Sequence, residues 1–303
     1  MRGLATNQEE TQYKVTGRQK LGRLTERFRD FWKRYSRSRP AVAGLIVLII
    51  LGLVAVFADQ VTLQNPYQLH PDQVLLPPTL QHIFGTDDLG RDVLGLVIFG
   101  SRVSLAVGLF SVLISASIGI AIGSLAGYYG GKIDDVLMRI TDTLLVIPSF
   151  FLILIVIAFF GSSIWNIIMI IGLTSWPGTA RLLRAQFLSL KNQEFVEAAR
   201  AVGAGDWRII SAHIIPNGIY PVIVNASLQV AAAILLEAGL SFLGLGDPTQ
   251  PSWGQMLTLA QLYLRKSWWM AIFPGFAICI TVLSYNLVGD SLNDALNPRL
   301  KEG

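Results

Sequence analysis

The sequence predicts an all-α polytopic membrane protein with six transmembrane helices. Three observations predict this fold class: 52% of the 303 residues are apolar, only 15% are charged, and uncharged apolar runs recur along the chain. An ordinary soluble domain carries about 25% charged residues. We therefore expect lipid, rather than water, to solvate much of the surface.

The six predicted spans are runs of about 20 residues with little or no charge. They cover residues 41–58, 103–127, 143–163, 164–180, 219–245 and 267–289. Forty residues precede the first run and no small-residue cleavage site follows it, so it is expected to remain as a membrane anchor.

The distribution of Lys and Arg predicts the orientation. With the N-terminus inside, 20 of the 24 basic residues fall on the cytoplasmic side, and both termini are predicted to be cytoplasmic. The expected organisation is a basic N-terminal segment (1–40), a first transmembrane helix (41–58), an extracytoplasmic loop (59–99), a core with five further spans (100–290) and a cytoplasmic tail (291–303).

The basic N-terminal segment carries an apolar stripe at helical spacing, made of Leu21, Leu24, Phe28, Phe31 and Tyr35. A basic helix with such a stripe suits the anionic cytoplasmic leaflet. The segment is otherwise simply a positive-inside anchor, and docking of a partner is the remaining alternative.

The extracytoplasmic loop is acidic, with Asp59, Asp72, Asp87, Asp88 and Asp92. Its stretch "FGTDDLGRDVL" does not match the carboxylate spacing of an EF-hand. We therefore expect a capped, structured loop and not a cation site.

Residues 194–217, "EFVEAARAVGAGDWRIISAHIIPN", form a charged interruption between apolar runs. Their pattern predicts a helix, a turn and a second helix that projects from the membrane. Gly203 is expected to end the first helix, and Asp206 to cap a second helix reaching Pro216. One apolar face of the first helix is predicted from the spacing of Phe195, Ala198, Ala199 and Val202.

This stretch resembles the EAA loop of ABC importer permeases. The matching positions are Glu197, Ala198, Ala199, Gly203, Ile215 and Pro216, and His213 stands where the general pattern has an aliphatic residue. Further stretches resemble the C-type subunit of the oligopeptide/dipeptide/nickel subfamily, in which His213 is usual. They are "FGTDDLGRDVL", "GSRVSLAVG", "GYYGGKIDDVLMRITD", "EAGLSFLGLG", "PSWGQML" and "NLVGDSLNDALNPRL".

The resemblance implies a type I ABC importer permease whose EAA loop docks on a separate ATPase. Glu197 would orient the coupling helix, Ala198 and Ala199 would allow close contact, and Gly203 would set the turn. The implied partners are a homologous second permease, two ATPases and an extracytoplasmic solute-binding protein. ATP and Mg are expected on the ATPases, with no cofactor on this chain. The implied cargo is a peptide; nickel or another chelated solute is the alternative.

Four polar residues in the predicted spans or at their ends are candidates for a gate or pathway, because polar groups are costly there. Glu237 is either a gate or an interfacial carboxylate paired with Arg265 or a backbone amide. Asp142 is expected to pair with Arg139. Asn225 and Gln229 either line a path or form hydrogen bonds between helices.

Gly119, Gly123 and Gly127 repeat at four-residue intervals, which predicts close helix packing, with a partner permease as one candidate neighbour. Proline residues that would kink or open the spans are Pro148, Pro177, Pro221 and Pro274.

Other protein classes fit the sequence poorly. The chain has no GxxxxGK[ST] or HExxH stretch, one cysteine and three histidines, so no catalytic set or metal site is predicted. Nothing suggests nucleic acid binding. A secondary transporter would need buried ion-coupling residues and usually internal repeats. The expected location is the cell membrane of a prokaryote, with several passes.

Overall fold

The computed structural model describes residues 26, 29, 31–62 and 65–296. These residues are mainly helical, and their β-structure is limited to one isolated bridge between Thr86 and Asp92. The helices are α2 (Arg39–Val56), α3 (Ala58–Val61), η1 (Pro71–Gln73), α4 (Val93–Tyr129), α5 (Gly131–Val146), α6 (Ser149–Phe160), α7 (Ile164–Leu190), α8 (Glu194–Ala201), α9 (Asp206–Arg208), the π-helical turn η2 (Ile209–Ile214), α10 (Ile215–Gly218), α11 (Tyr220–Phe242), α12 (Trp253–Tyr263) and α13 (Trp269–Leu296).

Four of these helices, α2, α4, α11 and α13, are long and apolar enough to cross a membrane. The pair α5 and α6 passes the same test jointly, although it is bent by 80°. The described chain thus has four apolar spans, or five with the bent pair, which confirms a polytopic helical membrane protein. The predicted span 164–180 lies in α7, a 27-residue helix that is less apolar and carries Arg181 and Arg184 in its second half.

Proline explains the bend between α5 and α6. Ile147 has extended backbone angles (φ −83°, ψ 120°), as expected for a residue before proline, and Pro148 then precedes α6. The other three prolines that were expected to kink or open a span do not break a helix. Pro177 and Pro274 lie inside α7 and α13, and Pro221 occupies the first turn of α11, where its missing N–H costs nothing.

The glycine repeat of α4 packs against α7 of the same chain. A Cβ at Gly119 would lie 2.6 Å from Cβ of Thr179, one at Gly123 would collide with the backbone of Ala180, and one at Gly127 with Phe187. Close packing was therefore predicted correctly. The prediction that a partner permease packs against these glycines is wrong, because α7 already covers this face.

The N-terminal stripe is only partly described. Leu21, Leu24 and Phe28 lie outside the described residues, whereas Tyr35 is 3% exposed and packs with Ala41 and Ala295, with Phe31 beside it. For Tyr35 the prediction of a lipid-facing stripe is wrong, and Phe31 is partly buried. They fill the space between the start of α2 and the end of α13.

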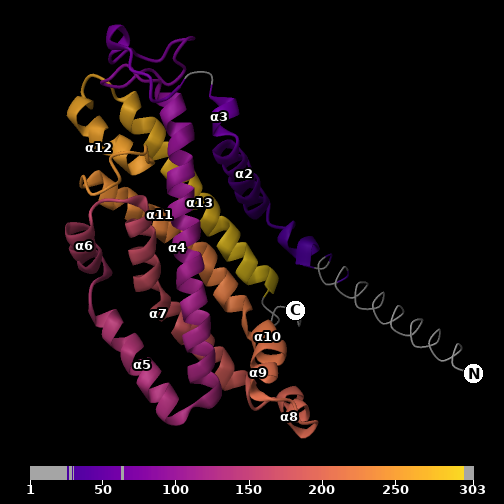
Figure 1. Ribbon diagram of the computed structural model, residues 1–303. Coiled ribbons are helices and arrows are strands. Elements are labelled where there is room, and N and C mark those ends of the chain that lie inside the picture. The colour runs from indigo at the N-terminus through magenta and orange to yellow at the C-terminus, as the bar shows by residue number, and fades with distance from the viewer. Residues whose placement is uncertain (1–25, 27–28, 30, 63–64, 297–303) are drawn as a thin grey trace, which may run out of the picture.

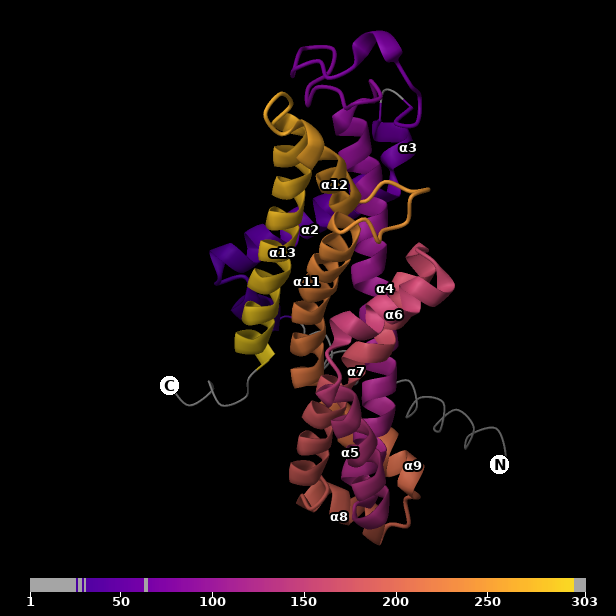
Figure 2. The ribbon, with the colours of Figure 1, turned by 90° about the vertical axis from the view of Figure 1, so that its left-hand side faces the viewer.

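The molecule has two distinct ends, which Figures 1 and 2 show from perpendicular directions. Residues 65–92 form the first, called here the long-loop end, where α4 begins and near which α12 lies. The second, the EAA end, is formed by α8, α9, η2 and α10. Because α4 has 37 residues, about 55 Å at 1.5 Å per residue, it reaches both ends.

Candidate coupling loop and polar sites of the bundle

A glycine terminates the first helix of the EAA end, as predicted. Gly203 has φ +80°, a left-handed conformation that costs glycine little. Its N–H donates to Arg200 O (2.9 Å), and the N–H of Ala204 donates to Ala199 O (3.0 Å). These two bonds form a Schellman motif, which satisfies the last carbonyls of α8 and fixes the turn.

The two alanines of the EAA stretch face opposite environments. Val196 and Ala199 are buried against the bundle, whereas Glu197 and Ala198 are exposed. The prediction that Ala198 and Ala199 share one outward face is therefore wrong. Apolar side chains that stay outside belong to other positions: Phe195 is 39% exposed, Val202 85% and Trp207 76%.

The second helical segment begins one residue earlier than expected. Gly205 is the N-cap of α9 and Asp206 is the first helical residue, so Asp206 does not cap. Its carboxylate instead accepts a hydrogen bond from the hydroxyl of Tyr128 (2.7 Å). The segment passes through η2 and α10 to Gly218, two residues beyond Pro216.

A π-helical turn lies within this second segment. The N–H of Ile215 bonds to Ile210 O, a longer ring than in an α-helix, directly before the exposed Pro216. His213 is half-buried in this turn, and its carbonyl accepts from Asn217 Nδ2 (2.7 Å). Such turns recur at functional sites. Sequence patterns of period 3.6 do not reveal them.

Tyr128, in the last turn of α4, contacts both halves of the EAA loop. Its hydroxyl bonds to Asp206 and the Arg200 guanidinium lies 5.8 Å from its ring centroid, within cation–π range. Tyr128 also belongs to a core with residues of α7, α8, η2 and α11: Leu183, Phe187, Val196, Ala199, Ile209, Ile210, Ile214 and Val222. Through this core, α8 is packed against side chains of three long helices, α4, α7 and α11.

Asn225 and Gln229 form hydrogen bonds between helices. Gln229 Nε2 donates to Thr179 Oγ1 (3.2 Å) and its Oε1 accepts from Ser115 (3.2 Å), joining α11 to α7 and α4. Asn225 Nδ2 lies 3.4 Å from Thr179 Oγ1. Gln229 also lines a cavity of about 210 Å³, together with Ser111, Ser149 and Ser175.

Glu237 is buried, at 2% exposure, in a cluster of serines. Its carboxyl accepts a hydrogen bond from Ser241 (2.7 Å) and lies 3.4 Å from the hydroxyl of Ser104 on α4. Ser252, the N-cap of α12, extends the cluster to Ser241. The predicted alternative of an interfacial ion pair between Glu237 and Arg265 is wrong. Arg265 is exposed and forms no ion pair in the described part of the chain.

Asp142 forms an ion pair between helices. Its carboxylate lies 2.5 Å from Arg181 of α7, so the predicted pairing with Arg139 is wrong. Closer to the EAA end, Asp134 of α5 accepts two hydrogen bonds from Arg184 of α7 (2.5 and 2.6 Å). Both side chains of the Asp142 pair are more than half exposed, which makes it a weak contributor to stability.

The long loop is capped and structured, as predicted. Asp92 caps α4 by accepting from Gly95 N (2.8 Å) and contacts the buried ring of His82 (3.1 Å). Asp87 accepts from two backbone N–H groups and from Arg91 Nε (2.7 Å). Within residues 31–62 and 65–296, no three His, Cys, Asp or Glu residues are placed to hold a metal ion.

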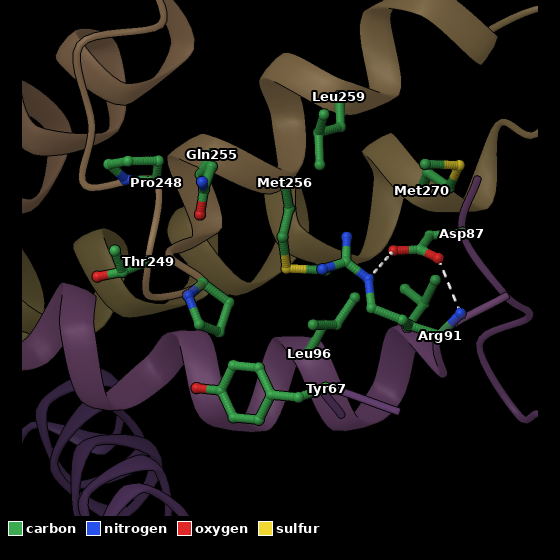
Figure 3. Close-up of a pocket in the computed structure, with 12 residues that line it drawn as sticks. Tyr67, Asp87, Arg91, Leu96, Pro248, Thr249, Gln255, Met256, Leu259 and Met270 are labelled. Atoms are coloured by element: carbon green, nitrogen blue, oxygen red, sulfur yellow. Dashed lines mark hydrogen bonds and ion pairs between the residues drawn. The ribbon is translucent and has the colours of Figure 1, made fainter. Parts of the chain in front are cut away.

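A pocket of about 150 Å³ opens beside this loop (Figure 3). Its walls come from the loop, the start of α4, the α11–α12 connection, α12 and the start of α13. Arg91 is its basic residue, and Met256, Leu259 and Met270 are among its apolar ones. The sequence pattern did not indicate this pocket, because its residues are spread over some 200 positions of the chain.

These features together are typical of a membrane transport subunit. The bundle has several apolar spans, its helical loop packs onto three of its long helices, and a cavity with polar lining lies between helices. Residues 119–302 match the family described as "Binding-protein-dependent transport system inner membrane component", and residues 26–78 match the "N-terminal TM domain of oligopeptide transport permease C". The chain belongs to this family of bacterial ABC permeases, multi-pass proteins of the plasma membrane.

Curated relatives agree with this assignment over nearly the full length. The chain is 39% identical over 275 residues to the dipeptide transport system permease protein DppC of Alkalihalophilus pseudofirmus, covering 90% of each protein. It is 40% identical to the glutathione transport system permease protein GsiD of Pectobacterium atrosepticum, covering 90% of this chain and 92% of that protein. A di/tripeptide permease of Pseudomonas aeruginosa is 38% identical, with the same coverage.

Among solved structures, the chain resembles an inward-facing structure of the MetNI methionine ABC transporter, with a TM-score of 0.56 and 18% identity. The match covers 67% of this chain and 97% of the other. This likeness shows a shared permease fold.

Proposed function

We propose that the chain forms one half of the translocation pathway of an ATP-driven, type I importer for short peptides. One observation carries the proposal: relatives 38–40% identical over 90% of the chain are named for dipeptide, di/tripeptide and glutathione transport. Glutathione is itself a tripeptide, so these cargoes share one chemistry.

The proposed assembly contains a homologous second permease, two ATPases that bind ATP and Mg, and an extracytoplasmic solute-binding protein. The chain would cross the membrane six times with both termini in the cytoplasm. The bent pair α5–α6 would be the third span, and α7, about 40 Å long, the fourth. The long-loop end then faces outward and the EAA end inward, which agrees with the excess of basic residues at 1–40 and 181–213.

Within this assembly, the exposed side of the EAA loop would dock on the ATPase. Glu197 and Ala198 lie on that side with Val202 and Trp207. Ala199 and Gly203 would hold α8 on the bundle, and His213 and Pro216 would shape the second segment. Closure of the ATPases would move α8, and Tyr128 would pass this motion to α4.

The polar residues of the bundle would act at different points of the pathway. Gln229, with Asn225 beside it, lies at the cavity between α4, α7 and α11, where a solute could pass. Glu237 would join α4, α11 and α12 as a gate element near the long-loop end. Asp142, through its pair with Arg181, would orient the inner part of the bent span relative to α7.

The experiment is ATP-driven uptake of labelled peptides of two to ten residues by the complete complex in proteoliposomes. Gly203→Pro should abolish uptake, because φ +80° is inaccessible to proline and the N–H bond to Arg200 is lost. Gly205→Pro is the matched control, because its φ of −69° suits proline. Glu197→Lys reverses the charge at the proposed docking face and should also stop uptake.

Uptake that survives both Gly203→Pro and Glu197→Lys in an assembled complex would reject the coupling role of this loop. Nickel or another chelated solute is the alternative cargo, and uptake of nickel without peptide would favour it. Uptake driven by an ion gradient without ATP would favour the remote alternative, a secondary transporter.

A further inference from the structure

The pocket at the long-loop end holds a guanidinium that is fixed by one edge only. Asp87 is 3% exposed, and its carboxylate accepts from the N–H groups of Leu89 (2.9 Å) and Arg91 (2.8 Å). It also accepts from Arg91 Nε at 2.7 Å. The two terminal amino groups of Arg91 have no hydrogen-bond partner among residues 31–62 and 65–296. The Arg91 side chain is 19% exposed.

This open edge faces an apolar wall. Figure 3 shows the Arg91 guanidinium directed away from the loop toward Met256, with Leu96, Leu259 and Met270 around it. Methionine adapts to side chains of different shape, which suits a site that accepts more than one residue type. A cavity of about 150 Å³ can hold one benzene-sized group, so there is room for one side chain but not for several.

We propose that this pocket binds the C-terminal residue of a peptide, with the α-carboxylate on the terminal amino groups of Arg91 and an apolar side chain against Met256, Leu259 and Met270. A guanidinium has five donors and pairs with carboxylates in a bidentate manner. Asp87 uses only one of these donors, so the side of Arg91 toward the cavity remains available for a second carboxylate.

The geometry favours a chain terminus over an internal loop of a partner protein. Only a C-terminal residue carries a free carboxylate and an apolar side chain on the same Cα, the two groups that this small pocket can hold together. An internal loop would offer a neutral backbone carbonyl, or a carboxylate on an Asp or Glu side chain, whose Cα carries no apolar side chain as well. The inference rests on the proposed peptide transport and adds to it a contact site for the cargo on the permease itself.

The test is photolabelling of the complex in nanodiscs, without ATP and without the binding protein. The probe is alanyl-photoleucine, and the labelled residues are identified by peptide mapping. Unlabelled Ala-Leu and its C-terminal amide are the competitors. Labelling should map to α12 and the start of α13, and Ala-Leu should compete about tenfold better than the amide, since a hydrogen-bonded charge pair is lost with the amide.

Three variants refine the test. Arg91→Gln should weaken competition by Ala-Leu about tenfold and remove the preference for acid over amide. Met256→Trp should fill the cavity and abolish labelling while the Asp87–Arg91 pair remains, which separates the pocket from folding of the loop. Arg265→Gln is the control, because it removes an exposed positive charge between α12 and α13 without altering the pocket lining.

Equal competition by acid and amide, or unchanged labelling in Arg91→Gln, would overturn the proposal. So would the absence of dipeptide labelling combined with a crosslink to the binding protein from photomethionine at position 256, in a second preparation that contains the binding protein. That result would assign the pocket to protein docking. ATP-driven uptake is measured separately. A complex that transports peptides but shows no such labelling therefore refutes this site and leaves the proposed function intact.

Discussion

Tyr128→Phe should loosen the EAA loop without disturbing the core. The change removes only the hydroxyl that donates to Asp206 at 2.7 Å, while the ring, buried at 9% exposure, keeps its packing. A hydrogen bond to a charged group contributes about 1.5–3 kcal/mol when it is shielded. Asp206 is exposed and water competes for it, so we expect a loss of about 1 kcal/mol.

That loss corresponds to a roughly fivefold larger opening constant for the loop. Native-state hydrogen exchange measures it directly in peptides that cover α8 and α9, because their amides exchange through local opening. Tyr129→Phe is the matched control: this neighbour is 48% exposed, and its hydroxyl makes no hydrogen bond within the described chain. Exchange in α4 itself should stay unchanged in both variants.

Equal exchange of α8 and α9 in the two phenylalanine variants would refute the reasoning. A double-mutant cycle with Asp206→Ala, which removes the acceptor, provides a second check. If the two groups act through one hydrogen bond, Asp206→Ala should add little in the Tyr128→Phe background, whereas independent effects would simply add.

Three further outcomes follow from the structure. Gly123→Ala should lower the free energy of unfolding of the detergent-solubilised complex by about 1–3 kcal/mol, because its Cβ meets the backbone of Ala180, while Gly52→Ala, with open space around it, should not. Glu237→Leu should lower the thermal unfolding midpoint more than Glu237→Gln, which keeps an acceptor for the serine hydroxyls; equal midpoints would count against the cluster. Burial and the neighbouring Asp87 raise the pKa of Asp88, and Asp88 Oδ1 has no hydrogen-bond partner in the described chain. At neutral pH this carboxylate is charged, which lowers the free energy of unfolding of the loop, so Asp88→Asn should raise it at pH 7. The increase should shrink as the pH falls from the raised pKa toward the ordinary value of 3.8 and be absent below that value; an increase independent of pH would contradict the assignment.

Local chain properties made much of the fold predictable. Absence of charge is a local property of the sequence, so three helices were predicted closely. Five of their six ends lie within three residues of the prediction, and only the end of α13 lies farther away, seven residues beyond it; the helices are α2, α11 and α13, predicted as 41–58, 219–245 and 267–289. The prediction for α4 began ten residues late, since Arg102 interrupts the apolar pattern but not the helix. Arg102 is accommodated by Asp59 (2.8 Å) and by the carbonyl of Ala55 (2.6 Å), a solution that needs the folded neighbour α2.

The partners of the candidate polar residues were not predictable in the same way. Glu237 was recognised as costly, yet Ser104 lies 133 positions away and Ser252 caps a helix that the spans did not include. Asp142 pairs with Arg181, 39 positions away, and not with Arg139, three positions away. In both cases tertiary packing, rather than local spacing, determines which hydrogen bond forms.

The wrong assignment of Ala198 and Ala199 to one outward face of α8 indicates where a partner would contact this helix. The stretch "EFVEAARAV" carries apolar residues on more than half of the helix circumference, and periodicity alone assigns Ala198 and Ala199 to one face. The bundle takes Val196 and Ala199. Phe195, Ala198 and Val202 then remain as a second stripe at helical spacing, exposed in the isolated chain. A short helix with two apolar stripes needs two neighbours to bury both of them, and the bundle supplies only one. We therefore expect this second stripe, and not the alanine pair as a unit, to contact the ATPase of the proposed assembly.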